Sequence, residues 1–283
     1  MLIRAVLFCL AFAVFMNGSA LAAGYRDGFD NAPSGEKMCK YWCVVPTTPY
    51  GGSPDAYHPT DEMFDVIFRR DRMAIKDGVM TLTLDDCATN KSACQNQRFA
   101  SGEYESLQFT SYGCYSGRMK AAKGSGIVSS FFLFDAGSAD QIDIEFLGKD
   151  TKMIQTGYYV KGQNNTDSDG NNMEQTPLGF DASADFHVYQ IEWNKDSLAW
   201  FVDGKEIRRS TLKGGPLPSA PSQLMANLWT GKKAEQFFGP FSYTGPISAH
   251  YDWVEFKEGS CAGTDLSEDA PTTTGAKQCR CKL

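Results

Sequence analysis

The feature that most restricts the fold of this chain is a succession of short runs that mix β-branched and aromatic residues with period-two alternation. They are separated by Gly, Asn, Asp and Pro, and helical periodicity is hard to find. "VDGKEI" (202–207) also places Asp203-Gly204 between apolar residues, which predicts a hairpin turn. The pattern predicts an all-β fold, a sandwich or barrel with two sheets on a shared core. The runs include "GVMTLTL", "GIVSSFFLF", "QIDIEFL", "FHVYQIEW" and "SLAWFVDG".

The amino terminus has the order of a secretory signal peptide. Arg4 precedes an apolar run at 5–15, and "SALAAG" supplies small residues of the kind used for cleavage. The apolar run is too short to span a bilayer. We therefore predict a signal peptide over 1–22, a secreted protein, and no membrane partner after cleavage, because no later run reaches about 18 apolar residues.

The mature chain carries an even number of cysteines. In an exported chain this favours disulfides, although the sequence does not fix their pairing. Metal binding is the weaker interpretation, because "CKYWC" and "CRC" lack the usual zinc spacing and no histidine stands beside them. The cysteines are Cys39, Cys43, Cys87, Cys94, Cys114, Cys261, Cys279 and Cys281.

Size and charge restrict the domain organisation and the partners. Residues 24–257 fit one all-β domain, followed by a polar, cysteine-containing tail over 258–283. The formal net charge is −7, with no basic block. Nucleic acid is excluded as a partner on this ground, because phosphate binding needs concentrated positive charge. An acidic, aromatic-rich, secreted chain suits an uncharged glycan, and we expect a monomer.

One strand-like stretch, "ADQIDIEFLG" (139–148), carries candidate chemistry. Alternation places Gln141, Asp143 and Glu145 on one face. Retaining glycosidases use two carboxyls about 5–5.5 Å apart. Residues four apart on a flat strand are separated by roughly 13 Å, so only a curved strand with converging side chains could bring their ends together. The alternative is a surface strand with a solvated polar face.

Several motifs in order resemble glycoside hydrolase family 16, in the branch of bacterial β-1,3-1,4-glucanases. The resemblance covers roughly residues 100–256 in register, and the tail is not part of it. It implies a jelly-roll β-sandwich of two antiparallel sheets with a concave glycan-binding cleft. The motifs are "GRMKAAKGSGIVSSFFLF", "QIDIEFLG", "LGFDASADFHVYQIEW", "WFVDG", "MANLWTG" and "YDWVEF".

The resemblance also implies roles for individual residues. Gln141 occupies the nucleophile position, Asp143 that of the assisting aspartate, and Glu145 that of the acid/base. No cofactor is implied for the chemistry, but Asp252 matches a position near a structural calcium in some members. Trp193, Trp200 and Trp253 are expected in the core. The cleft would be lined by Glu103, Glu105, Tyr159, Asn227 and Trp229.

The chain departs from the family pattern at three positions in or near this cleft. Gln141 replaces the nucleophilic glutamate, Glu105 stands where the family usually has arginine, and Ala139 replaces a common tryptophan. An amide is a far poorer nucleophile than a carboxylate and carries no charge to stabilise an oxocarbenium ion.

Several accounts of activity follow. Position 141 could be an isolated substitution in an active hydrolase, or the protein could bind glycan without cutting it. Hydrolysis could instead proceed with Glu105 or Asp143 activating water, which requires carboxyls about 6.5–9.5 Å apart. A cell-wall transglycosylase is a further alternative. We predict a secreted family 16-type protein acting on internal β-linkages of a β-glucan or related polysaccharide, with Glu145 as general acid/base.

Overall fold

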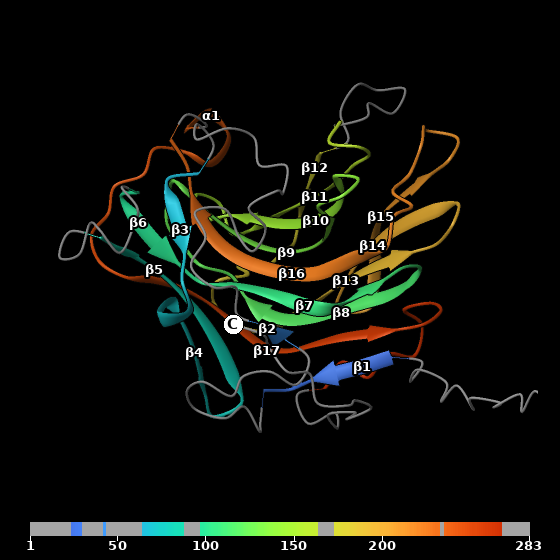
Figure 1. Ribbon diagram of the computed structural model, residues 1–283, viewed down its shortest axis with the longest axis horizontal. Helices are drawn as coiled ribbons and strands as arrows, with labels where there is room; N and C mark the ends of the chain where they lie inside the picture. Colours follow the sequence, from blue (N-terminus) through green and yellow to red (C-terminus); the bar gives the residue numbers. More distant parts are fainter. Residues whose placement is uncertain are drawn as a thin grey trace, which may run out of the picture.

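The computed structural model describes residues 24–29, 42–43, 64–87, 97–163, 173–232 and 235–267. Regular structure in these ranges is almost entirely β-strand, arranged in two sheets (Figure 1). The predicted signal peptide and most of the predicted tail lie outside the described residues. None of the helices in the described ranges has the length and apolar character that crossing a membrane requires.

The larger sheet has ten strands. Its main path runs β15-β14-β13-β8-β17-β5-β6-β3, with β1 beside β17 and β4 beside β5. A 3-10 helix (Arg70–Arg72) and α1 (Glu235–Phe238) are the described helices. The strands are β15 (Lys205–Thr211), β14 (Ser197–Val202), β13 (His187–Trp193), β8 (Gly113–Lys120), β17 (Ile247–Lys257), β5 (Val79–Asp86), β6 (Phe99–Ser101), β3 (Val66–Phe68), β1 (Gly24–Asp27) and β4 (Met73–Lys76).

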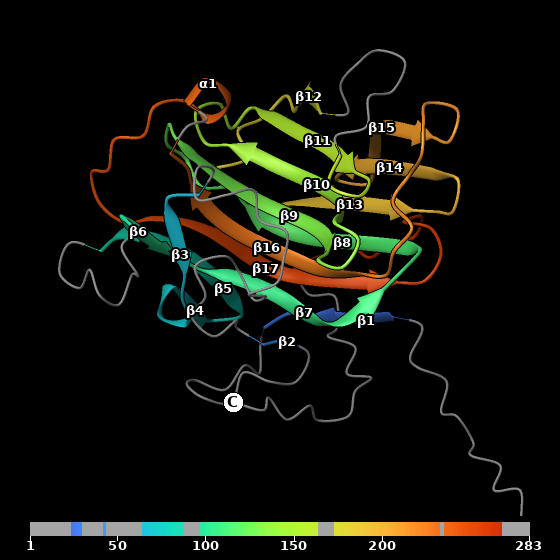
Figure 2. The ribbon, with the colours of Figure 1, turned by 45° about the horizontal axis from the view of Figure 1, so that its top comes forward.

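The smaller sheet has seven strands in the order β12-β11-β10-β9-β16-β7-β2, all antiparallel to their neighbours (Figure 2). A register shift between Gln223 and Met225 interrupts the pairing of β16 with β7, and such bulges bend a strand. Figure 1 shows β16 as a bent ribbon. The strands are β12 (Glu174–Pro177), β11 (Met153–Tyr159), β10 (Asp140–Leu147), β9 (Ile127–Asp135), β16 (Ser222–Thr230), β7 (Glu103–Thr110) and β2 (Trp42–Cys43).

The core lies between the two sheets. On β10 the apolar alternate residues Ile142, Ile144 and Phe146 are buried in it, and Phe146 packs against Tyr189 of β13 with ring centroids 4.8 Å apart. Burying one such side chain contributes about 1.5–3 kcal/mol. The expected core positions Trp193, Trp200 and Trp253 are all fully buried. The prediction of an all-β fold with two sheets on a shared core is confirmed.

The predicted hairpin turn is also confirmed. Asp203 and Gly204 join β14 to β15, and both have positive φ, 49° and 76°. Two-residue loops of this kind match the right-handed twist of the flanking strands, which is why Asp-Gly is favoured there.

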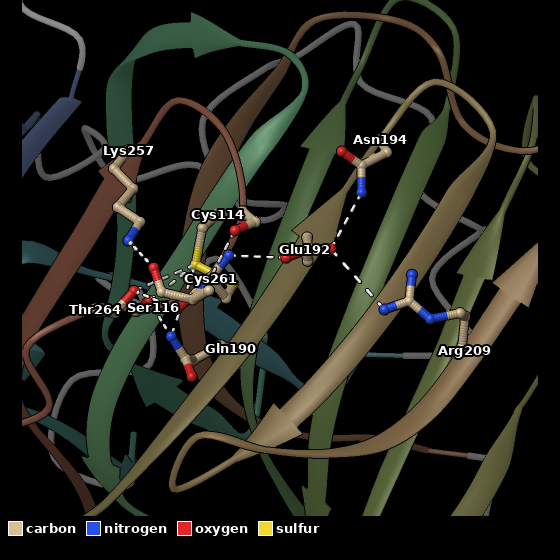
Figure 3. Close-up of a disulfide and its surroundings, with 11 residues drawn as sticks. Cys114, Ser116, Gln190, Glu192, Asn194, Arg209, Lys257, Cys261 and Thr264 are labelled. Atoms are coloured by element: carbon tan, nitrogen blue, oxygen red, sulfur yellow. Dashed lines mark hydrogen bonds and ion pairs between the residues drawn. A yellow bond between two sulfur atoms is a disulfide. The ribbon is translucent and has the colours of Figure 1, made fainter.

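A disulfide fastens the segment after β17 to the outer face of the ten-stranded sheet (Figure 3). Cys114 of β8 is bonded to Cys261. Glu192 of β13 accepts a 2.8 Å hydrogen bond from the Cys261 backbone N–H, and Arg26 of β1 donates to the Asp265 carbonyl at 2.9 Å. Cys87 is disulfide-bonded as well. The disulfide prediction is therefore confirmed for these three cysteines.

Candidate active site

The outward face of β10 carries the three residues of the sequence motif. Gln141 and Glu145 are partly exposed, whereas Asp143 between them is 1% exposed. They point away from the ten-stranded sheet because the alternate residues of β10 fill the core. The indole of Trp200 donates a 3.0 Å hydrogen bond to the Asp143 carbonyl, which ties this part of β10 to the core.

The Gln141 side chain contacts the next outward-facing residue of β10. Its Nε2 atom donates a 2.6 Å hydrogen bond to Oδ1 of Asp143, two residues along β10. The other carboxyl oxygen, Oδ2 of Asp143, is buried and has no hydrogen-bond partner among the described residues. The amide at position 141 is thus held by Asp143, and its oxygen remains free to accept a hydrogen bond.

A row of polar side chains crosses this face from strand to strand through Glu145. On one side Gln155 of β11 donates to Glu145 at 2.7 Å, and Gln175 of β12 donates to Gln155 at 3.2 Å. On the other side Ser130 of β9 is the direct neighbour of Glu145. Gln155 and Gln175 also help to line a pocket with Leu147, Lys149, Asp150 and Met153.

Beyond Ser130 the row continues to the far side of the sheet. Ser130 Oγ donates to Oδ1 of Asn227 on β16, and Asn227 Nδ2 donates to Glu103 of β7 at 2.9 Å. Glu103 is 4% exposed. The structure therefore brings two predicted positions, Glu103 and Asn227, into contact with each other and into one row with Glu145.

Burial controls the protonation of the carboxyls on β10. It raises the pKa of Glu145 to about 7, although the hydrogen bond from Gln155 acts in the opposite direction. Burial, reinforced by the nearby charge of Glu145, holds the pKa of Asp143 well above its usual range. A partly exposed carboxyl with a pKa near neutrality is suited to give and take a proton.

A second pair of carboxyls lies on β7. Burial and the neighbouring Glu105 raise the pKa of Glu103 to about 8, and burial raises the pKa of Glu105 to about 7. Glu105 shares a cross-strand register with Asp143 through Met225 and Phe132. Three strand spacings correspond to roughly 14 Å between the backbones, so Glu105 lies across the face from β10.

The two neighbouring tyrosines of β11 face opposite sides of the sheet. Tyr158 is 1% exposed in the core, and Tyr159 is partly exposed on the site face directly opposite Gln141. Burial, reinforced by the charges of Asp143 and Glu145, raises the pKa of Tyr159.

Trp229 is 4% exposed and packs against Phe64 and Phe238, with ring centroids 4.9 and 5.6 Å apart. The prediction that Trp229 helps to line the cleft stays a prediction.

Asp252 lies away from this face, on β17. Its carboxylate forms a 2.5 Å ion pair with Arg118 of β8, so a cation already faces it. The described part of the chain contains no group of three or more His, Cys, Asp or Glu residues suited to a metal. A structural calcium near Asp252 stays a prediction.

Sequence reasoning missed the polar neighbours that complete the row. Gln155 is four residues before Tyr159 on β11, so strand alternation puts both side chains on the same face and could have placed Gln155 in the site. It also missed Asp140, whose buried carboxylate accepts backbone hydrogen bonds from Lys161 and Ser219, both at 2.9 Å, and from Ala220. Asp140 thereby fixes the start of β10 against two loops.

Known proteins are similar to this chain in sequence and in architecture. Residues 60–255 match the family description Glycosyl hydrolases family 16. A β-glucanase of Bacillus subtilis is 36% identical over 256 residues, which cover 88% of this chain and 93% of the relative. A β-glucanase of Bacillus amyloliquefaciens is 38% identical and covers 72% of this chain and 80% of the relative.

Solved structures agree with these matches. A prokaryotic β-1,3-1,4-glucanase (lichenase) from a mouse hindgut metagenome superposes with a TM-score of 0.69 at 32% identity, covering 83% of this chain and 99% of that one. The β-glucanase of Bacillus licheniformis gives a TM-score of 0.68 at 32% identity, with 83% and 98% coverage. The jelly-roll sandwich expected from the resemblance is confirmed, and the chain belongs to glycosyl hydrolase family 16, a family of glycosidases.

Proposed function

We propose that this protein is a secreted, monomeric endo-glycosidase that cleaves internal β-linkages of a β-glucan or a closely related β-linked polysaccharide. Glu145 is its general acid/base. The relatives that cover most of this chain are named β-glucanases, and this supports the substrate class. The Cys114–Cys261 disulfide is consistent with secretion, because such bonds persist in oxidising compartments.

One observation carries the proposal: Glu145 stands partly exposed in the middle of the polar row with a pKa raised to about 7 by burial. A glycosidase needs such a group to protonate the leaving oxygen and then to deprotonate water. Gln155 on β11 holds it by a hydrogen bond of 2.7 Å.

The test is the release of new reducing ends from a panel that contains barley β-glucan, lichenan, laminarin and β-1,4-linked N-acetylglucosamine oligomers. We expect turnover of at least one member, and a loss of about 10²–10⁴-fold in Glu145→Gln. Turnover that survives Glu145→Gln at full rate would exclude Glu145 as the acid/base. A Glu258→Gln variant, on the exposed segment after β17, is the matched control.

A second candidate is a glycan-binding protein without turnover. It is favoured by the amide of Gln141, which lacks the charge and nucleophilicity of a carboxylate. Isothermal titration with members of the same panel separates the two functions. Binding without any turnover would support the second candidate and exclude the first.

A further inference from the structure

Position 141 holds an amide where a two-step retaining glycosidase needs a carboxylate. In the covalent mechanism that carboxylate attacks the anomeric carbon and forms an ester with the sugar. The amide of Gln141 cannot do this efficiently. A glycosidase without its own nucleophile can still retain configuration when the substrate supplies one, as in substrate-assisted families.

No other described carboxyl on this face is well placed to replace the nucleophile. Asp143 is 1% exposed, and its Oδ1 atom is occupied by the Gln141 amide. Glu103 is 4% exposed and bonded to Asn227. Glu105 lies three strand spacings from β10, about 14 Å between backbones. Proton transfer at β10 is therefore left to Glu145, and the nucleophile must come from a ligand that Gln141 binds.

The hydrogen bonding of Gln141 defines what it presents to a ligand. Because its Nε2 donates to Asp143, its Oε1 is an acceptor toward the open face. Tyr159 lies directly opposite on β11, and Cβ atoms of such pairs are about 4.5–5.5 Å apart. Burial, reinforced by the nearby acidic groups, raises the pKa of Tyr159, so its hydroxyl is a donor at neutral pH.

An acceptor and a donor at directly paired positions of β10 and β11 complement an acetamido group, which has one N–H and one carbonyl oxygen. We infer that the polysaccharide this site cleaves carries a 2-acetamido-2-deoxy sugar on the non-reducing side of the scissile bond, and that its acetamido oxygen is the nucleophile. Gln141 Oε1 accepts the acetamido N–H, and the Tyr159 hydroxyl orients the carbonyl. This inference rests on the proposed function, whose substrate class it narrows.

The reaction balances with water as the only co-reactant. First, the acetamido oxygen bonds to the anomeric carbon while the bond to the leaving oxygen breaks, and Glu145 protonates that oxygen. This gives a bicyclic oxazolinium ion, whose N–H faces Gln141 and whose charge lies near Asp143. Glu145 then takes a proton from water, the water oxygen bonds to the anomeric carbon, and the bond to the acetamido oxygen breaks. The product has the configuration of the substrate.

The decisive experiment compares oligomers that differ only in the acetamido group. Wild-type protein is incubated with a β-1,4-linked N-acetylglucosamine pentamer, its de-N-acetylated counterpart, and a glucose pentamer of the same linkage. We expect the acetylated pentamer to be cleaved at least about 100-fold faster, since only it carries a nucleophile. Proton NMR of the first product should show retention, and a thiazoline analogue of the bicyclic intermediate should inhibit.

Cleavage of all three pentamers at similar rates, or an inverted product, would overturn the inference. Turnover of an unsubstituted glucan through Glu145, with none of the acetylated oligomer, would overturn it while leaving the proposed function intact. Turnover of no substrate would refute both.

Variants at the two positioning groups add a second test. Gln141→Ala should reduce kcat on the acetylated pentamer by about 10-fold or more, and Tyr159→Phe should reduce it similarly, because each removes one hydrogen bond to the reacting group. Glu258→Ala, at an exposed position after β17 and outside the site, is the matched control. Unchanged kcat in both variants would contradict the assigned roles.

Discussion

Gln155 and Glu145 face each other on paired strands, and Gln155 Nε2 donates a 2.7 Å hydrogen bond to Glu145 Oε2. The bond favours the charged carboxylate, while burial disfavours it, and the balance sets the pKa of Glu145 at about 7. The protonation of Glu145 therefore depends on a residue of the adjacent strand β11 and not only on the β10 motif that contains it.

Replacing Gln155 should move the pH dependence of activity. In Gln155→Leu the carboxylate loses its donor, so the pKa of Glu145 rises and the general acid stays protonated at higher pH. We expect the alkaline limb of kcat/KM to shift upward by about one pH unit on a polysaccharide that the wild type cleaves. Gln175→Leu is the control, because Gln175 contacts Gln155 and not Glu145. A shift downward in pH would contradict this assignment.

The Gln141→Glu variant should gain turnover of unsubstituted β-glucans. A carboxylate at 141 supplies the nucleophile that the wild type lacks, and covalent retaining hydrolysis then needs no group from the substrate. We expect a rise of about 100-fold or more in reducing ends released from barley β-glucan. Gln141→Asn, which keeps an amide, should show no gain. An equal gain in both variants would show that charge at 141 is not the missing element.

Glu103 should make stability depend on pH. Its folded pKa of about 8 lies above the ordinary value of 4.5. Below about pH 4.5 both states hold the proton, whereas between 4.5 and 8 only the folded state does, so stability falls as pH rises. The slope for one such group is about 1.4 kcal/mol per pH unit at most.

Glu103→Gln removes the titratable carboxyl, while the amide oxygen of glutamine can still accept the hydrogen bond from Asn227. Urea unfolding at pH 5, 6, 7 and 8 should therefore show a flatter decline in the variant than in the wild type. Parallel curves for the two proteins would show that Glu103 ionises normally in the folded state.

Asp140 should contribute strongly to the free energy of unfolding, although it takes no part in proton transfer by Glu145. Its buried carboxylate accepts from the backbone of Lys161, Ser219 and Ala220. Asp140→Ala leaves these N–H groups unsatisfied, and we expect a loss of about 2–4 kcal/mol in the free energy of unfolding by urea. Glu258→Ala, at an exposed position, should change it by less than about 0.5 kcal/mol.

The Cys114–Cys261 disulfide should stabilise the fold without affecting catalysis. It joins residues 147 apart in sequence, on the outer face of the sheet that does not carry Glu145. Cys114→Ser/Cys261→Ser should lower the free energy of unfolding by about 2–5 kcal/mol. On a polysaccharide that the wild type cleaves, kcat of the double variant should stay within about twofold of the wild-type value. A larger loss would indicate coupling between the two sheets.

Local pattern was sufficient for much of the fold. Period-two alternation on β10 predicted which residues face the core and which face outward, and both sets lie as expected. The dipeptide Asp203-Gly204 was enough to predict the hairpin turn, because few residue pairs adopt positive φ at both positions. Strand alternation gives the face on which Trp229 lies, but it does not show that Phe64 and Phe238 pack against its ring.

The sequence by itself determined the strand pattern, the family, and the identity of the amide at 141, because these depend on residue type and spacing along one chain. Only the tertiary structure decided that Gln155, Ser130, Asn227 and Glu103 form one row with Glu145, and that Tyr159 faces Gln141. Strand order and register bring these residues together from distant parts of the chain. The protonation of the site follows from the burial and neighbours that this register creates.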